Sequence, residues 1–194
     1  MLPEKDDLHE IGVIHGRFQV LHNDHMKYLL AGKSRCSHLV VGITNPDPYL
    51  TKADPSNPER SVRTENPLNY FERYLMMNAA LTEAGLRHEE FSVVPFPINF
   101  PKLYGYYVPL DAVFYVTVYD RWGKRKVQLL ESMRLKVEVM WAKPPTEKGL
   151  SGIFVRECMM NGEPWERMVP RSTAGLMKKW RIPERLRQLR SPGP

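Results

Sequence analysis

The stretch Ile11–His25, IGVIHGRFQVLHNDH, decides the expected fold. Its first residues, Ile11–Ile14, form a short apolar run that stops at Gly16, which is typical of a buried strand. Asn23–Lys33 follows with apolar residues at helical spacing. A buried strand that passes through a short turn into a helix predicts the first unit of an α/β sheet, with the turn at the carboxyl end of the strand.

The rest of the chain continues this alternation. Runs rich in β-branched and aromatic residues predict strands at His38–Ile43, Phe91–Val94, Ala112–Val118 and Val137–Trp141. Helices are predicted at Arg125–Met133, from Ser151 onward, and from Asn66 to Gly85, where Asn66 suits the N-cap and Pro67 the first turn. The polar stretch Thr44–Glu65 and the Pro- and Tyr-rich stretch Pro95–Pro109 are expected to be irregular.

Elements in this order predict an α/β fold, a Rossmann-like, doubly wound parallel sheet of about five strands with a helical C-terminal segment. We expect a single domain over residues 1–194, with the α/β core at 11–141 and the helical segment at 151–190. In the helix after Asn66, the apolar positions expected to face the core are Leu68, Phe71, Leu75, Met76 and Leu81.

The composition excludes several classes of protein. Hydrophobic residues make up 42% of the 194 residues and charged residues 26%, which gives too many core formers for a disordered chain. No apolar stretch approaches the roughly 18 residues of a membrane span, and the acidic start MLPEKDDLHE does not resemble a signal peptide. The two cysteines, Cys36 and Cys158, lie outside any metal-ligand spacing, so we expect a reducing, cytoplasmic setting.

The net charge of +6 is concentrated near the C-terminus. From Arg167 to the end there are eight Lys and Arg residues against one acidic residue, Glu184. Such a run indicates either a solvated helix face or a field that attracts a polyanion such as a nucleoside triphosphate. No aromatic-interleaved basic motif accompanies it, so we expect no nucleic acid as partner, and without an apolar span no membrane.

The turn after the first strand carries the candidate chemistry. His22 and His25 lie three residues apart, so they share one face of the first helical turn. Two imidazoles beside a helix N-terminus can donate hydrogen bonds to phosphate oxygens, and Arg17 would add a planar donor fork. The alternatives for the pair are an exposed helix face or half of a zinc site, for which no further Cys or His ligand is evident.

The segment Gly16–His25, GRFQVLHNDH, resembles the GRFQPxHxGH signature of the HxGH nucleotidyltransferases, and most of all that of the archaeal-type nicotinamide-nucleotide (NMN) adenylyltransferases. Thr64–Pro67, followed by Glu72-Arg73, is similar to the family's TxENPFxxxER. Leu150–Arg156 resembles ISGTxIR, and Asn161–Pro170 resembles the xGxxWxxLVP tail. The four motifs occur in the family's order and cover nearly the whole chain.

The resemblance implies a reaction and the residues that perform it. Members transfer a nucleoside monophosphate from a nucleoside triphosphate to a phosphate acceptor and release pyrophosphate; the most similar members make NAD from ATP and NMN. The catalytic residues implied are His22, His25 and Arg156. The nucleotide-binding residues implied are Gly16, Arg17, Phe18, Gln19, Ser151 and Gly152. Asn66 and Arg73 are implied at the substrate, although capping by Asn66 and an ion pair for Glu65 or Arg73 fit as well.

Little chemistry is asked of the protein in such a reaction. The acceptor phosphate is already a nucleophile, so catalysis is in-line positioning and charge neutralisation. No carboxylate cluster for a metal site is visible, so we expect no protein metal ligand and Mg²⁺ arriving with the triphosphate. The expected partners are small molecules, the triphosphate and a phosphate-bearing acceptor, and the family resemblance is compatible with a homo-oligomer.

Four positions depart from the family pattern. Asp24 replaces the Gly of HxGH, Ile153 the Thr of ISGTxIR, and Val20 the Pro of GRFQP. The family places a Trp that stacks on nicotinamide where this chain has Phe96–Tyr104 without a Trp; Phe100, Tyr104 or Tyr106 would stack instead, or pack under a loop.

Three functions therefore stay open. The first is an NMN adenylyltransferase, and the second is a cytidylyltransferase acting on a small phosphate or phosphonate metabolite. The third, suggested by Asp24 and Ile153, is a non-catalytic nucleotide-binding regulator.

Overall fold

The computed structural model describes residues 8–51, 65–147 and 149–190. Its five strands pair in parallel in the order β3-β2-β1-β4-β5. The strands are β1 (His9–Gly16), β2 (Cys36–Thr44), β3 (Phe91–Phe96), β4 (Val113–Val118) and β5 (Lys136–Ala142). The order of strands reverses between β1 and β4, which makes their carboxyl ends the place where an α/β sheet of this kind binds ligands. The Rossmann-like prediction is confirmed.

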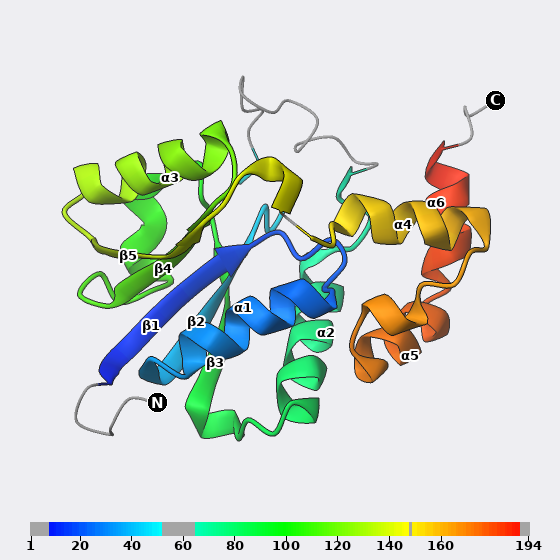
Figure 1. The fold of residues 1–194 in the computed structure, drawn as a ribbon, viewed down its shortest axis with the longest axis horizontal. Helices are drawn as coiled ribbons and strands as arrows, with labels where there is room; N and C mark the ends of the chain where they lie inside the picture. Colours follow the sequence, from blue (N-terminus) through cyan, green and yellow to red (C-terminus); the bar gives the residue numbers. More distant parts are fainter. Residues whose placement is uncertain (1–7, 52–64, 148, 191–194) are drawn as a thin grey trace.

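Helices cover both faces of the sheet (Figure 1). One face carries α1 (Asn23–Lys33) and α2 (Tyr70–Glu83), and the other carries α3 (Arg121–Ser132). The C-terminal segment forms α4 (Gly152–Asn161), α5 (Arg171–Lys179) and α6 (Ile182–Arg190), which lie beyond α1 and α2 in Figure 1. Short 3-10 helices are η4 (His88–Glu90), η5 (Pro101–Tyr106), η6 (Pro145–Glu147) and η7 (Glu166–Met168).

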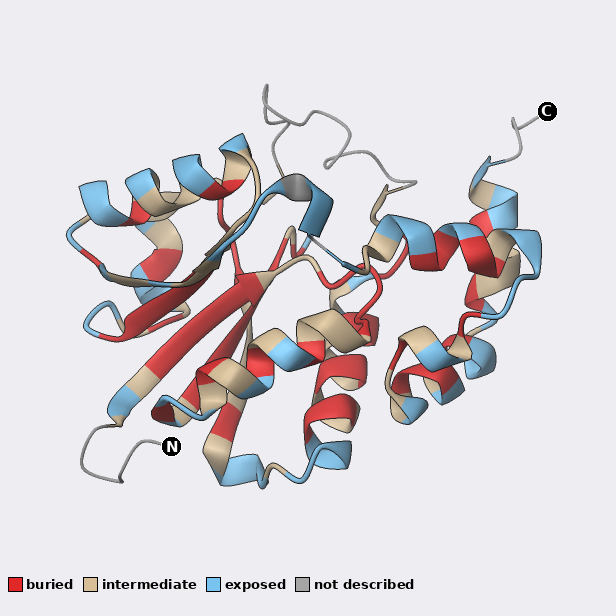
Figure 2. Cartoon of the chain, viewed as in Figure 1, coloured by how far each residue is buried: buried red, intermediate tan, exposed pale blue. Residues whose placement is uncertain are grey.

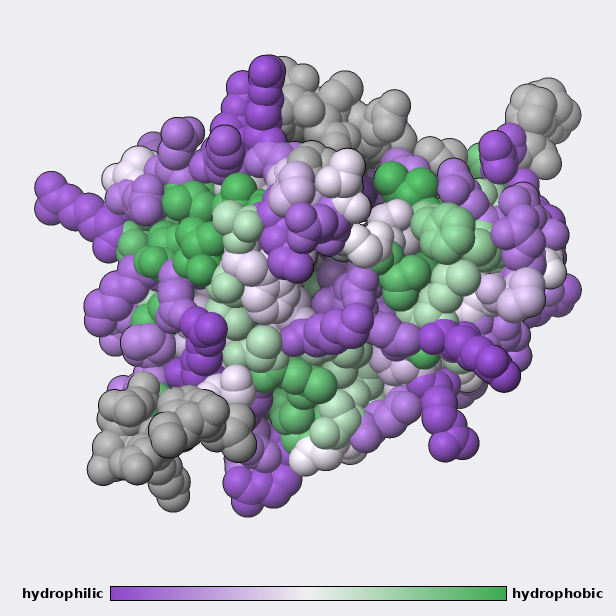
Figure 3. Space-filling view, viewed as in Figure 1, coloured by the Kyte–Doolittle hydropathy of each residue, from purple (hydrophilic) through white to green (hydrophobic). Residues whose placement is uncertain are grey.

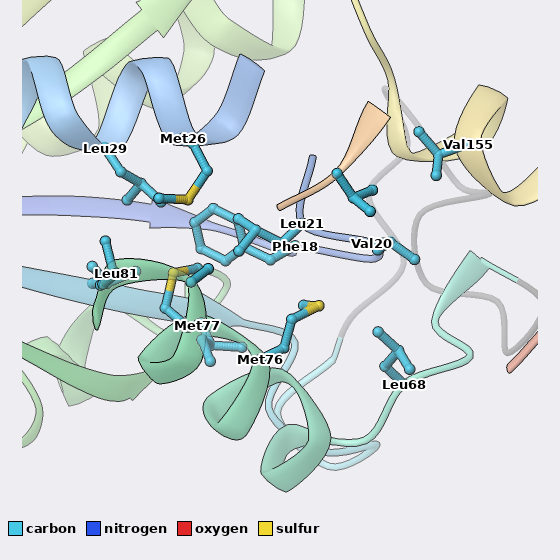
Figure 4. Packing of buried hydrophobic residues seen from close by; sticks show 14 of the residues in the cluster. Phe18, Val20, Leu21, Met26, Leu29, Leu68, Met76, Met77, Leu81 and Val155 are labelled. Atoms are coloured by element: carbon cyan, nitrogen blue, oxygen red, sulfur yellow. The ribbon is translucent and has the colours of Figure 1, made fainter. Parts of the chain in front are cut away.

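The core lies in two layers, one on each face of the strongly buried strands (Figure 2). On the α1 and α2 side, the buried cluster continues from the sheet through α2 to the C-terminal helices, where it includes Val155, Met177 and Leu186. Phe18 lies in this layer between α1 and α2 (Figure 4). The turn that carries the candidate chemistry is thus itself part of the core, which fixes its position relative to the helices.

Polar contacts also fasten the C-terminal helices to α2. The Glu83 carboxylate accepts hydrogen bonds from the main-chain N–H groups of Arg171 and Ser172 at the start of α5. Arg185 of α6 forms an ion pair with Glu72 at 2.7 Å. Arg185, a member of the C-terminal basic run, therefore uses its charge to hold α6 on α2.

Several predicted boundaries are wrong. Asn66 does not cap a helix; Asn69 does, through a reciprocal pair of hydrogen bonds with Glu72, and α2 begins at Tyr70. Phe71 is 63% exposed, because the buried face of α2 contains Glu72, Arg73, Met76, Met77, Ala80 and Leu81 and Phe71 lies outside it. The helix is thus capped at Asn69, after the Asn66-Pro67 pair that was expected to start it.

Two other expectations also change. Asp120 caps α3 by accepting from Gly123 N–H, so this helix starts at Arg121 and not at Arg125. The expected irregular stretch Pro95–Pro109 contains η5. Thr64 and the rest of 52–64 in the other irregular stretch lie outside the described residues.

Hydrophilic residues dominate the face shown in Figure 3, and apolar residues appear there in separate patches. No helix in the described part of the chain combines the length and the apolar character needed to cross a membrane.

Candidate functional site

A cavity of about 350 Å³ opens at the carboxyl ends of β1 and β4. The turn after β1 and the N-terminal ends of α1, α3 and α4 surround it. All residues predicted to bind nucleotide or to catalyse line this cavity, namely Gly16, Arg17, Phe18, Gln19, His22, His25, Ser151, Gly152 and Arg156. Segments more than a hundred residues apart in sequence therefore meet at the switch point of the sheet.

The two histidines form a stacked pair at the start of α1. His22 is the N-cap residue; its Nδ1 accepts from His25 N–H at 3.4 Å, and His25 Nδ1 accepts from His22 N–H at 3.4 Å. The ring centroids lie 3.6 Å apart, and the Phe18 ring packs edge-on against His25. Because each Nδ1 accepts a main-chain hydrogen bond, the proton of a neutral ring lies on Nε2, which makes Nε2 the donor atom of both side chains.

The N-terminus of α4 abuts the turn after β1. Ser151 caps this helix by accepting from Phe154 N–H at 3.2 Å, as predicted. Gly152 lies against the main chain of the turn, where a Cβ would come within 2.6 Å of the Gln19 carbonyl oxygen. The turn and the helix start thus present their main chains to the same cavity, an arrangement suited to an anion because the first N–H groups of a helix lack intrahelical partners.

Arg156 joins three segments at the floor of this region. Its Nη1 donates to the Gln19 carbonyl in a very short contact, and its Nη2 pairs with the Glu65 carboxylate at 2.5 Å. Arg156 is 3% exposed, while Glu65 is partly open to the cavity. In this structure the guanidinium charge is balanced by a carboxylate, so a polyphosphate that approached Arg156 would compete with Glu65.

The turn after β1 is held from the α2 side as well. The Gln19 side chain makes two hydrogen bonds with the main chain of Leu68, at 2.8 and 2.9 Å. Arg73 is 1% exposed and donates to the carbonyls of Arg17, Thr44, Asn45 and Asn69. Burial, with the neighbouring Arg17, lowers the pKa of Arg73 to about 10. Main-chain acceptors thus occupy a guanidinium whose role was expected to be substrate contact or an ion pair.

The four residues predicted to bind substrate do not line the cavity: Asn66, Arg73, Phe100 and Tyr104. Tyr104 is fully buried in the second core layer, stacks near Phe96 and donates to the Ile98 carbonyl at 2.7 Å. The expectation that Tyr104 replaces a stacking Trp is therefore corrected, because η5 turns its ring into the core. The residues of the C-terminal basic run do not line the cavity either, so the described structure favours the interpretation as a helix surface.

Comparisons with known proteins agree with the sequence motifs. No protein-family model matches the chain. A phosphonoformate cytidylyltransferase from Streptomyces viridochromogenes is 50% identical over 176 residues, which cover 91% of this chain and 95% of that protein. A nicotinamide-nucleotide adenylyltransferase from Thermococcus kodakarensis is 31% identical over 180 residues, with 92% and 87% covered. The chain belongs to the HxGH nucleotidyltransferases.

The solved structures extend this relationship to the fold. A bifunctional NMN adenylyltransferase/ADP ribose pyrophosphatase from Francisella tularensis, complexed with AMP and a manganese ion, matches with a TM-score of 0.64 at 12% identity. The match covers 93% of this nucleotidyltransferase but about half, 52%, of the bifunctional chain. At this identity the likeness establishes the fold alone.

Asp24 stands where the family's nucleotidyltransferases have glycine, and it has a clear local role here. Its Oδ2 accepts from Leu150 N–H at 2.7 Å and its Oδ1 pairs with Lys27 at 2.7 Å. Partial burial acts to raise the pKa of Asp24, but these bonds hold it below its ordinary value. The carboxylate thus tethers the segment before α4 to the start of α1.

Sequence reasoning missed the far wall of the cavity in this nucleotidyltransferase. His15 comes from β1, Lys126 comes from α3, and Asp120 is the N-cap residue of that helix. Tyr28 and Trp141, whose rings meet edge-on at 5.7 Å, close the side near β4 and β5. The available signal was topological and covers part of the wall: His15, Asp120 and Trp141 lie at or just after the carboxyl ends of strands, where ligands are expected.

Proposed function

We propose that this nucleotidyltransferase is a cytidylyltransferase that transfers the cytidylyl group of CTP to a small phosphonate. The observation that carries the proposal is the 50% identity to a phosphonoformate cytidylyltransferase, against 31% for the T. kodakarensis adenylyltransferase over a similar share of the chain. The cavity supports it, since Phe100 and Tyr104 do not line it, and a small acceptor needs no aromatic side chain to stack upon.

In the proposed reaction, an oxygen of the acceptor phosphonate attacks the α-phosphorus of CTP. A new P–O bond forms while the bond from the α-phosphorus to the bridging oxygen of the β-phosphate breaks, and that oxygen leaves with pyrophosphate. No proton transfer is required, because the phosphonate oxygen is already an anion. The demand on the protein is to align the two phosphorus centres and to neutralise the charge on the leaving group.

Under the proposal, particular groups of the cavity perform these tasks. Under the proposal, His22 and His25 donate from Nε2 to oxygens of the triphosphate, and the first N–H groups of α4 add main-chain donors at Ser151 and Gly152. Arg156 contributes by releasing the Glu65 carboxylate and pairing with a phosphate instead. The phosphate then supplies the negative charge that Glu65 supplies in this structure. Gly16, Arg17, Phe18 and Gln19 shape the turn around the nucleotide.

Mg²⁺ would take part in this reaction bound to the triphosphate. The described residues contain no group of three or more His, Cys, Asp or Glu side chains placed to hold a metal ion. Under the proposal, the ion would come with the triphosphate and would neutralise part of its charge. A cytoplasmic location agrees with the use of CTP and with the reduced, buried Cys36 and Cys158. One core cluster is shared by the sheet and the C-terminal helices, which supports a single domain.

NMN adenylyltransferase is the second candidate. The motifs and the 31% identity to the T. kodakarensis protein favour it. Adenine would stack on the Tyr28 and Trp141 rings that close one side of the cavity. It needs a site for nicotinamide that the predicted aromatic residues, Phe100 and Tyr104, do not supply at this cavity.

Pyrophosphate release separates the candidates. The purified protein is assayed with CTP or ATP and Mg²⁺ against an acceptor panel that contains phosphonoformate, other small phosphonates and NMN. We expect turnover with CTP and a small phosphonate, and a kcat/KM for CTP at least about 10-fold above that for ATP. Turnover with ATP and NMN alone would replace the proposal with the second candidate. Triphosphate binding without turnover on any acceptor would indicate a regulator.

A further inference from the structure

His15 is a buried side chain of the cavity wall that the proposed reaction has not used. It lies next to the last residue of β1 and is 6% exposed. Its ring centroid lies 5.0 Å from that of Phe96 at the end of β3. Gly42 of β2 is its register partner, and a Cβ at Gly42 would press on Phe96 at 2.8 Å and on His15 at 3.3 Å. The absence of a side chain there leaves the room that the two rings occupy.

Neither ring nitrogen of His15 has a hydrogen-bond partner among the described residues. A buried polar atom without a partner costs free energy, so such atoms are rare unless a ligand or water supplies the bond. His38 shows the ordinary solution: both of its ring nitrogens are paired, with the Glu89 carbonyl and the Ser92 hydroxyl at 2.9 Å. His15 lines the cavity, which makes a molecule in the cavity the natural partner.

The position of His15 indicates which substrate that is. The paired histidines and the start of α4 define the phosphate region, and Tyr28 and Trp141 define an aromatic wall beside β4 and β5. His15 instead points to the face of the sheet that holds Phe96, toward β2 and β3. Under the proposed function the base of CTP would stack on Tyr28 and Trp141, so the acceptor would lie on the opposite side of the cavity, where His15 is.

We propose that His15 donates a hydrogen bond to a non-reacting oxyanion of the acceptor, its carboxylate or a second phosphonate oxygen, and so determines acceptor specificity. The inference rests on the proposed function and names a specificity residue for it. Burial, together with the charge of Lys126, lowers the pKa of His15 well below its ordinary value, so the ring is neutral and has one N–H to donate. Lys126 also lines the cavity, and its positive charge acts on His15.

The experiment compares wild type with His15→Phe, which keeps an aromatic ring against Phe96 but cannot form a hydrogen bond, and with His15→Gln, which restores an N–H donor. KM and kcat are measured separately for CTP and for the acceptor that the wild type uses best. His88→Phe, an exposed histidine outside the cavity, is the matched control. We expect His15→Phe to raise the KM of the acceptor at least about 10-fold, the size of one lost hydrogen bond to a charged group.

The KM of CTP should stay within about 2-fold in both variants, and the Gln variant should recover part of the acceptor affinity. An acceptor KM within 2-fold of wild type in His15→Phe would overturn the inference and identify His15 as a packing residue. Equal losses in the Phe and Gln variants would also overturn it, because shape and not the hydrogen bond would then matter. A wild-type protein that uses no acceptor of the panel refutes the proposed function itself, so the two failures are distinct.

Discussion

Gly152→Ala tests whether close contact between α4 and the turn after β1 builds the site. The added Cβ would lie 2.6 Å from the Gln19 carbonyl oxygen, 3.1 Å from its carbonyl carbon and 3.2 Å from Val20 N. All three neighbours are main-chain atoms, so no side chain can rotate away. Relief requires α4 to move by several tenths of an ångström, and Ser151 and Arg156 move with it. Overpacking of this kind costs about 1–3 kcal/mol.

For a chain of this size, that loss lowers Tm by about 2–12 °C, at 2–4 °C per kcal/mol. Turnover should fall by about 10-fold or more, since misplacement approaching 1 Å at a reacting centre can cost about 10²-fold. Thermal unfolding and pyrophosphate release measure the two effects on one preparation. A variant with the Tm and turnover of wild type would show that the contact is dispensable and refute this reasoning.

A second glycine provides the control for this substitution. Gly175 lies on the exposed side of α5, and a Cβ there would meet no atom within 4 Å. Gly175→Ala should stabilise the protein by about 0.5–1 kcal/mol, because alanine restricts the unfolded chain and favours a helix. Its turnover should equal that of wild type, which separates a general effect of alanine from the local clash at Gly152.

Three further outcomes follow from the site. His25→Ala should lower kcat at least about 10²-fold with little change in Tm, since it removes a donor to the transferring phosphate; an effect under a few-fold would place His25 outside the chemistry. Arg73→Lys should lower the free energy of unfolding in urea by about 3 kcal/mol, because one ammonium cannot replace a fork that serves four carbonyls; unchanged stability with a raised acceptor KM would instead support substrate contact. Asp24→Ala should cost about 1 kcal/mol at neutral pH through the lost Leu150 bond. Since the folded pKa of Asp24 lies below its ordinary 3.8, this contribution is complete above that value and is lost as the pH falls through the folded one, so the difference between wild type and variant should shrink below about pH 4; a constant difference would contradict it.

The sheet and the phosphate side of the site could be predicted because local signals carry them. Apolar runs mark the strands, and the spacing of His22 and His25 places both rings on one helical turn whatever happens elsewhere. Ser151 was predicted as a cap from its type and place, and it is one. The family motifs predicted that Gly16 and Arg156 belong to one site, and both residues line the cavity.

The positions of Arg73, Tyr104 and His15 could not be predicted, because long-range contacts decide them. Arg73 was expected at the substrate or in an ion pair, and only the fold reveals the four carbonyls that surround it. Tyr104 belongs to a stretch rich in tyrosine, and its direction depends on η5, a short helix without a strong sequence signal. His15 looks like part of an apolar strand until its ring is seen against Phe96 in the cavity wall.

The contacts that fix the turn after β1 have a consequence for how heat and distant substitutions affect this protein. Arg73, Arg156 and the Gln19–Leu68 pair grip one short loop from three directions, so its shape is set when the chain folds and not when a ligand arrives. Heat, or substitutions far from the cavity, that loosen α2 or α4 therefore loosen this loop as well, because it shares their core. Catalytic activity should be lost over the same temperature range as the fold, and both should return together on cooling.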